Sequence, residues 1–356
     1  MRRRCLCATT ALALSGYVSF LPARADADEA LADFKAGRYL EASAEIQAVV
    51  DRTPAYDYGY FLLGHCMLKM RRSAEAQLQF RRALILNPTR AEYYQGFALA
   101  LKASGNWPLM IRAATDGIAR ATDPRTRSAL LALRAYAWSA LRRWNAAVRD
   151  LEEVQRTQPE PWVLAFLGKA RFASGAWADA IQPLRQAFEA APDDQVVLRL
   201  LAECSLRLAA DERDPIRKKF TYTQSLVYAK RLASVSPGDV DAVNLVGRAA
   251  LGAGQLAQAE IVFRHVLAHD PRQCYALANL GRTYMAAARW AEAEAYLRNA
   301  TACAPRLTTV YESLGELYLQ LGKPQEAADA FRRAEEIEPT HARTDPGAAI
   351  PVFQPR

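Results

Sequence analysis

Two adjacent stretches of the sequence decide the fold. Residues 274–305 read CYALANLGRTYMAAARWAEAEAYLRNATACAP, and residues 308–339 read TTVYESLGELYLQLGKPQEAADAFRRAEEIEP. In both stretches the seventh and eighth residues are leucine and glycine, the twentieth is alanine, the twenty-fourth is large and apolar, and the thirty-second is proline. A fixed period of this length indicates an array of similar structural units that can use the whole chain as one body.

The same period extends along almost the entire chain. Position 32 holds the prolines Pro54, Pro88, Pro159, Pro192, Pro237, Pro271, Pro305 and Pro339, and position 8 holds the glycines Gly64, Gly168, Gly247, Gly281 and Gly315. Alanine recurs at position 20, and large apolar residues recur at positions 7 and 24. Small residues at positions 8 and 20 let two antiparallel helices approach closely, and the bulky residues fill the space beside them. The pattern therefore predicts repeated helical hairpins.

This pattern resembles the tetratricopeptide repeat, a 34-residue unit with small residues at positions 8 and 20 and proline at position 32. The resemblance implies an all-α fold, a right-handed α-solenoid of about nine helical hairpins that covers residues 26–339. One hairpin cannot bury its apolar face alone, so each is expected to stack on its neighbours. The repeats are expected to end near residues 54, 88, 122, 159, 192, 237, 271, 305 and 339.

Two repeats depart from the pattern. The third lacks the proline and carries Pro108, Ala114 and Gly117, so we expect an irregular or loosely packed second helix. The sixth is about 11 residues longer than its neighbours, with the excess around residues 211–219. We expect that excess to form a solvated turn between its two helices, and the alternative is a protrusion that contacts a partner.

The two ends of the chain differ from the array. Residues 1–25 begin with Arg2, Arg3 and Arg4, continue with a mostly apolar stretch and end in Ala-Arg-Ala, which is the layout of a secretory signal. We expect cleavage before Asp26 and a periplasmic or secreted mature protein, and an uncut membrane anchor is the alternative. Residues 340–356 contain three prolines without helical periodicity, so this tail is expected to be disordered when alone.

Composition narrows the class of protein further. Hydrophobic residues make up 51% and charged residues 24% of the chain, which suits a folded soluble protein, and the predicted mature chain has no membrane span. The formal net charge of the chain is +8, and four arginines in the first 25 residues contribute +4 of it, so the remainder carries +4. That charge is too small to indicate nucleic-acid binding.

Catalytic motifs are not found in the sequence. It contains no GxSxG, GxxxxGK[ST], HExxH or dinucleotide-type glycine run, so we predict neither an enzyme nor a cofactor. His265 and His269 lie four residues apart, with Cys274 and Cys303 in the next repeat. The two cysteines could form a disulfide, stay as buried thiols or share a metal site with the histidines, and we predict no metal.

Four tryptophans occupy one repeat position. Trp107, Trp144, Trp177 and Trp290 all fall at position 17, where the repeat family carries an aromatic residue that packs between neighbouring hairpins. We therefore interpret them as structural and not as a carbohydrate-stacking set.

The resemblance also implies where a partner binds. In the family the first helices line a concave groove, and positions 2, 5, 9, 12 and 13 meet an extended peptide or a helix. The corresponding residues here are Tyr58, Phe61, His65, Lys69, Tyr136, Trp162, Lys169, Arg199, Arg207, Asn244, Arg248, Tyr275 and Arg282. Aromatic and basic side chains favour an acidic protein partner. The alternative is an anionic polysaccharide, as in an accessory of exopolysaccharide export. The family's carboxylate clamp for C-terminal peptides is not reproduced.

Overall fold

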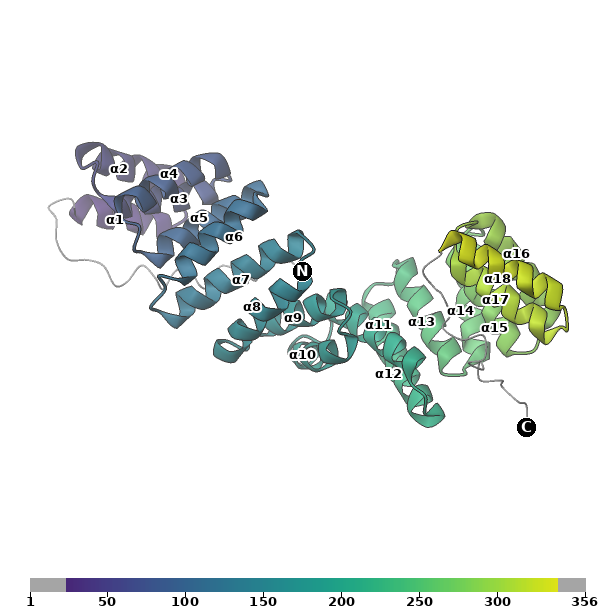
Figure 1. Cartoon of the computed structure of the whole chain (residues 1–356). Coiled ribbons are helices and arrows are strands. Elements are labelled where there is room, and N and C mark those ends of the chain that lie inside the picture. The colour runs from purple at the N-terminus through teal and green to yellow at the C-terminus, as the bar shows by residue number, and fades with distance from the viewer. Residues whose placement is uncertain (1–23, 339–356) are drawn as a thin grey trace. The chain divides into compact units, whose positions relative to one another are not determined.

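The computed structural model describes residues 24–338, and all regular structure in this range is helical (Figure 1). The first nine helices are α1 Arg24–Lys35, α2 Tyr39–Arg52, α3 Asp57–Lys69, α4 Ser73–Leu86, α5 Ala91–Ser104, α6 Trp107–Ile118, α7 Pro124–Ala140, α8 Trp144–Thr157 and α9 Pro161–Ala173. The remaining helices are α10 Trp177–Ala190, α11 Gln195–Asp211, α12 Pro215–Val235, α13 Val240–Gly252, α14 Leu256–His269, α15 Cys274–Ala286, α16 Trp290–Cys303, α17 Thr308–Gln320 and α18 Pro324–Ile337. The predicted all-α fold of about nine hairpins is confirmed within the described residues.

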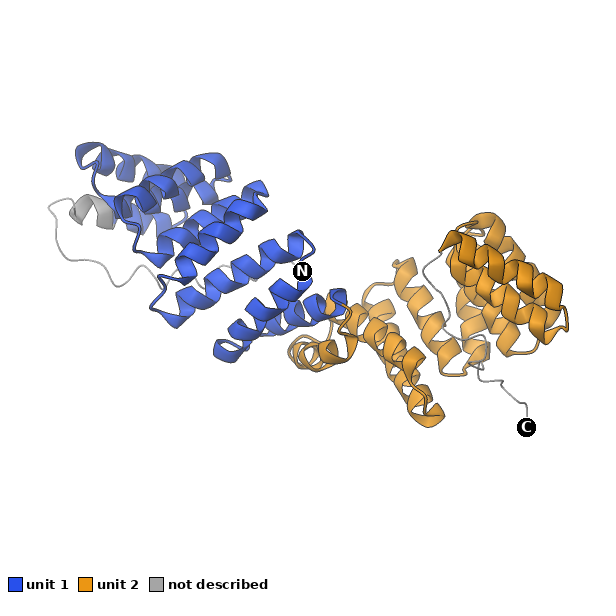
Figure 2. Cartoon of the chain, in the orientation of Figure 1, with its two compact units in different colours: residues 1–174 blue, residues 175–356 orange. Residues whose placement is uncertain are grey.

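The chain divides into two compact units (Figure 2). Unit 1 comprises residues 1–174 and holds α1 to α9, and unit 2 comprises residues 175–356 and holds α10 to α18. The boundary falls in the turn after α9. The predicted extent of the repeat array, residues 26–339, stays a prediction. Within each unit a helix packs on the next one along the chain.

Each core is built by rings that lie against glycines. In unit 1 the buried side chain of Phe80 lies between α3 and α5, and a Cβ added at Gly64 would come within 2.7 Å of its ring. A Cβ at Gly96 would overlap the same ring. In unit 2 Phe263 meets Gly247 in the same way, at 2.6 Å. The repeated glycine therefore provides the close helix approach that the sequence pattern predicted.

The turn inside most hairpins needs one residue in the left-handed conformation. Glycines fill this place in five hairpins, at Gly37, Gly105, Gly175, Gly254 and Gly322. Three hairpins use a residue with a side chain instead, namely Arg71, Arg142 and Ala288, with φ between 55° and 62°. Left-handed backbone costs such residues about 1–2 kcal/mol, so these three turns depend on the packing around them.

The prediction for the third repeat is wrong. Its second helix, α6, is regular over residues 107–118, and Met110 and Ala114 are fully buried. Pro108 lies in the first helical turn, where its missing N–H removes no intrahelical bond, and Asn106 caps the helix by accepting from Leu109 N. Gly117 is buried against Tyr94 and Leu130, so its lack of a side chain serves close packing.

The extra residues of the sixth repeat also differ from expectation. They lengthen both helices, to 17 residues in α11 and 21 in α12, and leave only residues 212–214 as a connection. Asp214 caps α12 by accepting from Ile216 N and Arg217 N, and Pro215 begins the helix. The expected solvated turn is replaced by helical extensions because cap, proline and helix-forming residues occur together there.

The predictions for the two chain ends lie almost wholly outside the described residues. The signal interpretation of residues 1–25 and the disorder of residues 340–356 stay predictions. The predicted cleavage point falls in the first turn of α1. Within residues 24–338 no helix is both long and apolar enough to cross a bilayer.

Candidate partner-binding faces

The first helices of the hairpins form one side of each unit. In unit 1 α3 contacts α5 and α5 contacts α7, and in unit 2 α11, α13, α15 and α17 contact one another in succession. Even-numbered helices make no comparable contacts with each other among the described residues. Elements on the inside of a curved stack lie closer together than those on the outside, so the odd-numbered helices carry the inner face of each unit.

At the start of unit 1 the predicted contact residues pack mostly into the core. The ring of Phe61 lies 5.0 Å from that of Tyr93 and 4.5 Å from that of His65, and only 7% of Phe61 is exposed. Burial, with a smaller contribution from the charge of Lys69, lowers the pKa of His65 to about 4, so the imidazole is neutral at pH 7. Phe61 and His65 pack against the large rings of neighbouring helices, and their role as partner contacts stays a prediction.

Tyr58 and Lys69 flank these buried rings. Tyr58 is half-buried, 5.6 Å from the Phe61 ring, and burial raises its pKa to about 12. Lys69 is exposed at the end of α3. Both remain accessible to a partner.

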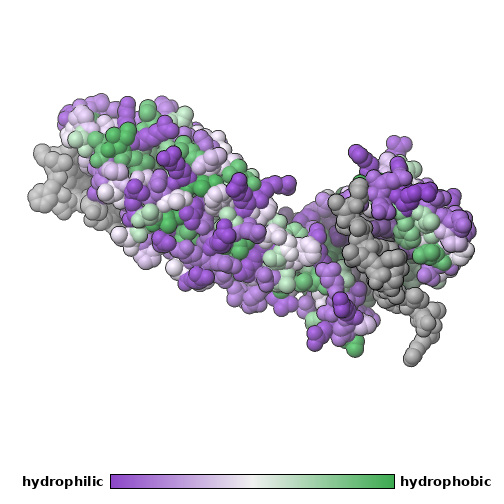
Figure 3. All heavy atoms as spheres, viewed as in Figure 1, coloured by the Kyte–Doolittle hydropathy of each residue, from purple (hydrophilic) through white to green (hydrophobic). Residues whose placement is uncertain are grey.

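Further along unit 1 the inner face carries accessible rings and cations. Tyr136 is 38% exposed, the Lys102 ammonium lies 4.0 Å from its ring centre, and Trp107 lies 5.8 Å from it. Burial lowers the pKa of Lys102. Trp162 is 45% exposed, and Lys169 is exposed on the same helix. In Figure 3 apolar side chains lie in patches among polar ones on the visible face of unit 1.

In unit 2 the predicted residues divide into paired and unpaired groups. Arg199 forms an ion pair with Asp239, and the other carboxylate oxygen of Asp239 caps α13 through Asp241 N and Ala242 N. Arg199 therefore joins α11 to α13, and its role as a partner contact stays a prediction. Arg207 stacks 4.7 Å above the ring of Trp177.

Asn244 and Arg248 lie one turn apart on α13. Asn244 is 7% exposed, and its Oδ1 is buried with no hydrogen-bond partner among the described residues. Arg248 is exposed to solvent, yet burial by surrounding atoms lowers its pKa. Glu203 opposes this shift, whereas the charges of Arg207 and Arg282 add to it.

Tyr222 lies close to the charges of Arg248 and Arg282, and the repeat positions used for the predicted contacts do not include it. A Cβ at Gly252 would overlap its ring, so the lengthened α12 lies with Tyr222 directly on α13. Burial raises the pKa of Tyr222, and the nearby charges of Arg282 and Arg248 oppose that rise. Counting back from Pro237 puts Tyr222 at position 17, the place of the four tryptophans, so the repeat pattern contained the signal. Tyr275, on α15, is 62% exposed.

The tryptophans at position 17 contact the hairpin cores. Trp107, Trp144 and Trp290 each pack, half-buried, against a hydrophobic cluster of their own unit, and Trp177 holds Arg207. These contacts agree with the structural interpretation.

The cysteine cluster takes one of its three predicted forms. Cys274 and Cys303 are joined as a disulfide, with Cα atoms 5.5 Å apart, between the start of α15 and the end of α16. The two sulfurs are bonded to each other, so they do not form a metal site with His265 and His269. The rings of these two exposed histidines lie 4.8 Å apart. Cys66 and Cys204 are buried thiols, and burial raises the pKa of each to about 12.

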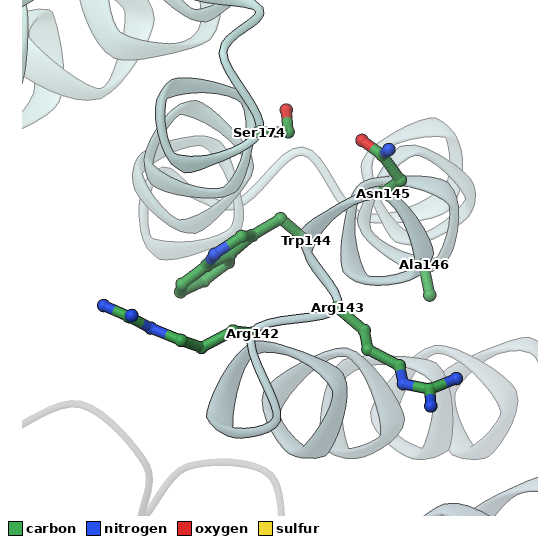
Figure 4. Close-up of a pocket in the computed structure, with 6 residues that line it drawn as sticks. All are labelled: Arg142, Arg143, Trp144, Asn145, Ala146 and Ser174. Carbon is green, nitrogen blue, oxygen red and sulfur yellow. The ribbon is translucent and has the colours of Figure 1, made fainter. Parts of the chain in front are cut away.

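A small open pocket lies at the turn between α7 and α8 (Figure 4). Its lining residues are Arg142, Arg143, Trp144, Asn145, Ala146 and Ser174. None of the predicted contact residues lines it. Within the described range, no three side chains of metal-ligand type lie together.

Comparison with known proteins agrees with the geometry. The sequence profile of the tetratricopeptide repeat matches residues 278–342. The crystal structure of the C-terminal part of a TPR repeat-containing protein from Cytophaga hutchinsonii superposes with a TM-score of 0.56 at 18% identity, over 71% of this chain and 99% of that one. A tetratricopeptide repeat protein from Parabacteroides merdae gives 0.54 at 14% identity, over 70% and 93%. No curated protein sequence matches the chain.

Fold and repeat pattern together define an α-helical repeat protein. Residues 278–342 match the tetratricopeptide repeat profile, and the described part of the chain has the fold of solved tetratricopeptide repeat proteins, as the sequence pattern indicated. Proteins of this type generally mediate protein–protein interaction, and the fold is typical of non-catalytic scaffolds.

Proposed function

We propose that this protein is a non-catalytic scaffold or assembly factor of the bacterial cell envelope, which binds an acidic protein partner on the inner faces of its two units. The observation that carries the proposal is the set of exposed rings and cations that successive first helices present. Trp162 and Lys169 do so in unit 1, and Arg248, Tyr275 and Arg282 do so in unit 2.

These residue types suit a peptide partner for physical reasons. Exposed aromatic rings supply contact area with few rotatable bonds, and arginines supply forked donors for carboxylates. The inner face also resists collapse, because position-8 glycines and position-20 alanines hold the helices in fixed register behind it. A preorganised surface loses little conformational entropy when a partner binds.

Export to the envelope is supported by the arrangement of residues 1–25 and by the disulfide. A bond between Cys274 and Cys303 persists in an oxidising compartment and is rare in the cytosol. Both observations come from different parts of the chain and favour the same location.

The proposal is tested by capture from fractionated cells. The tagged protein is crosslinked in intact bacteria, and the proteins that copurify from the envelope fraction are identified by mass spectrometry. We expect a defined set of envelope proteins with wild type, and its loss in the triple variant Trp162→Ala, Arg248→Ala, Arg282→Ala. A control variant, Arg306→Ala, removes an exposed arginine outside the inner face and should keep the set.

Two outcomes would contradict the proposal. If the triple variant captured the same proteins as wild type, partner binding on the inner face would be disproved. If an anionic polysaccharide copurified without protein, the alternative function, an accessory of exopolysaccharide export, would be favoured instead.

A further inference from the structure

The helix α12 is longer than the repeat requires, and its additional residues lie at its start (Figure 1). The other second helices of unit 2, α10, α14, α16 and α18, have 14 residues and end two residues before a proline at position 32. The 21 residues of α12 also end two residues before such a proline, Pro237. Residues 215–221 therefore extend its N-terminal end by about 10 Å.

Three large apolar side chains form a stripe along this helix. Ile216 is 81% exposed, and Phe220 and Val227 are each 62% exposed. They follow one another at steps of four and seven residues, which keeps them on one face of the helix. The opposite side packs into unit 2 through the buried residues Ser225, Leu226, Ala229 and Leu232. The apolar stripe of Ile216, Phe220 and Val227 thus faces away from the core of its own unit.

The same helix is strongly basic. It contains no aspartate or glutamate, and its cations are Arg217, Lys218, Lys219, Lys230 and Arg231. Lys219 and Lys230 are exposed, and each lies three residues after a member of the apolar stripe, so the two lysines border the stripe. An apolar stripe with lysines along its edge is typical of helices that lie in the interface of a bilayer.

The acidic residues just before α12 leave these cations largely free. Asp214 accepts from Ile216 N and Arg217 N, and Glu212 accepts from the next two backbone N–H groups. Asp211 is exposed at the end of α11. The Arg217 side chain lies 3.8 Å from Asp214 and is 77% exposed, so it remains accessible to an anion outside the protein. The start of α12 therefore presents positive charge next to the apolar stripe.

A bilayer surface fits this face better than a second protein does. Specific protein interfaces bury about 800 Å² on each partner, which three side chains on one helix do not supply. A bilayer needs no complementary shape, because apolar side chains enter the boundary below the headgroups and cations bind anionic headgroups beside them. The apolar stripe runs about 16 Å along the helix, so it can lie flat on such a surface.

We propose that the outer face of α12, with the apolar stripe at its centre and Arg217, Lys219 and Lys230 at its edges, binds the surface of an anionic bilayer. The apolar side chains enter the boundary between headgroups and acyl chains, and the three cations contact lipid phosphates. Because α12 is a second helix, this contact leaves the inner face of unit 2 accessible. The inference goes beyond the proposed function and does not depend on the partner of the inner faces.

Vesicle binding of the purified full chain tests the proposal. The vesicles contain either equal parts of phosphatidylglycerol and phosphatidylcholine or phosphatidylcholine alone, and bound protein is measured by cosedimentation. Each cation near an anionic surface contributes about fivefold to binding. We therefore expect at least about tenfold tighter binding to the anionic vesicles, and we expect the difference to shrink as salt rises.

Two double variants separate the apolar and the charged contributions. Ile216→Ser with Phe220→Ser removes most of the apolar stripe, and Lys219→Gln with Lys230→Gln removes the bordering charges. Each pair is expected to lower the affinity for anionic vesicles by at least about tenfold. All four side chains are exposed, so the fold should be kept, which unchanged circular dichroism and melting check.

Matched controls make the same kinds of change outside α12. Ile261→Ser removes an apolar side chain of α14 that is 68% exposed, and Arg306→Gln removes an exposed cation of unit 2. Both are expected to bind anionic vesicles as wild type does.

Photocrosslinking to the vesicles locates the contact independently of residues 1–25. Benzoylphenylalanine replaces Phe220 or Ile261 in the full chain, and the vesicle-bound protein is irradiated and weighed by mass spectrometry. We expect a lipid adduct from position 220 and none from position 261.

The contrary results are distinct. Equal binding of wild type and both double variants, or no lipid adduct from position 220, would overturn the proposal. A protein adduct from position 220 in intact cells, without a lipid adduct, would assign this face to a protein partner instead. Absence of vesicle binding, together with protein capture in cells that depends on Trp162, would remove this inference alone and leave the scaffold function standing.

Discussion

His65 shows how one buried residue sets a dependence on pH. The folded environment holds its pKa at about 4, below the value of about 6.5 expected in the unfolded chain. Between these values the unfolded chain binds a proton that the folded chain does not. The resulting stabilisation is complete above pH 6.5 and is lost as the pH falls towards 4, by up to about 3 kcal/mol.

The variant His65→Phe tests this effect. Phenylalanine fits against Phe61 and Phe80, and it removes the titrating group, so its hairpin should lose less stability on acidification than wild type. The measurement is native-state hydrogen exchange of α3 and α4 at pH 7 and near pH 4.5, read as the difference between variant and wild type. His265→Phe, on the exposed face of α14, is the control. Equal acid sensitivity of His65→Phe and wild type would disprove a neutral buried imidazole.

At the scale of elements, the disulfide should stabilise one hairpin. It closes a segment of 29 residues between α15 and α16, and the chain-entropy account gives about 3–4 kcal/mol for a loop of that length. We expect Cys274→Ala with Cys303→Ala to reduce the melting temperature and to raise hydrogen exchange in α15 and α16, while α3 and α4 keep their protection.

A thiol count checks the bond itself. The chain from Asp26 contains four cysteines, of which Cys66 and Cys204 are free. Titration of the denatured, unreduced protein from cells, after its N-terminus has been shown to be Asp26, should find two thiols for each chain. Four thiols would show that the bond does not form there.

Prediction from sequence was strongest where one residue type has one physical role. The glycines at position 8 and prolines at position 32 indicated hairpins, and the rings of Phe80 and Phe263 against Gly64 and Gly247 show why. It failed for α6 because Pro108 was judged as a helix breaker without regard to its place in the first turn. It failed for the sixth repeat because helical extensions and a loop have similar composition.

The candidate site was predicted less completely than the fold. Repeat positions place Arg248 and Arg282 on the first helices α13 and α15, but they do not say which neighbours cover a side chain. Phe61 and His65 are closed over by Tyr93 and Phe80, and Arg199 is engaged by Asp239 from another helix. Tyr222 was missed because the extra residues concealed its repeat position. Such contacts depend on tertiary packing between repeats.

The whole molecule is two repeat units that offer inner faces of different chemistry. Unit 1 has buried rings at its start and accessible rings with lysines further on, and unit 2 has the exposed Arg248 and Arg282 and the buried amide of Asn244. Because each hairpin contacts mainly its neighbours, a change on one face is expected to leave the other unit folded. Substitutions on the inner face can therefore be interpreted as effects on binding.

Site-specific photocrosslinking in living cells tests the central claim most directly. Benzoylphenylalanine replaces Tyr275 on the inner face or Ile261 on α14 of the outer layer, which are 62% and 68% exposed. The account predicts a protein adduct from position 275 that disappears when Arg248 and Arg282 are replaced by alanine, and no adduct from position 261. An adduct of equal yield from position 261, or none from position 275 while position 261 reacts, would contradict partner binding on the inner face.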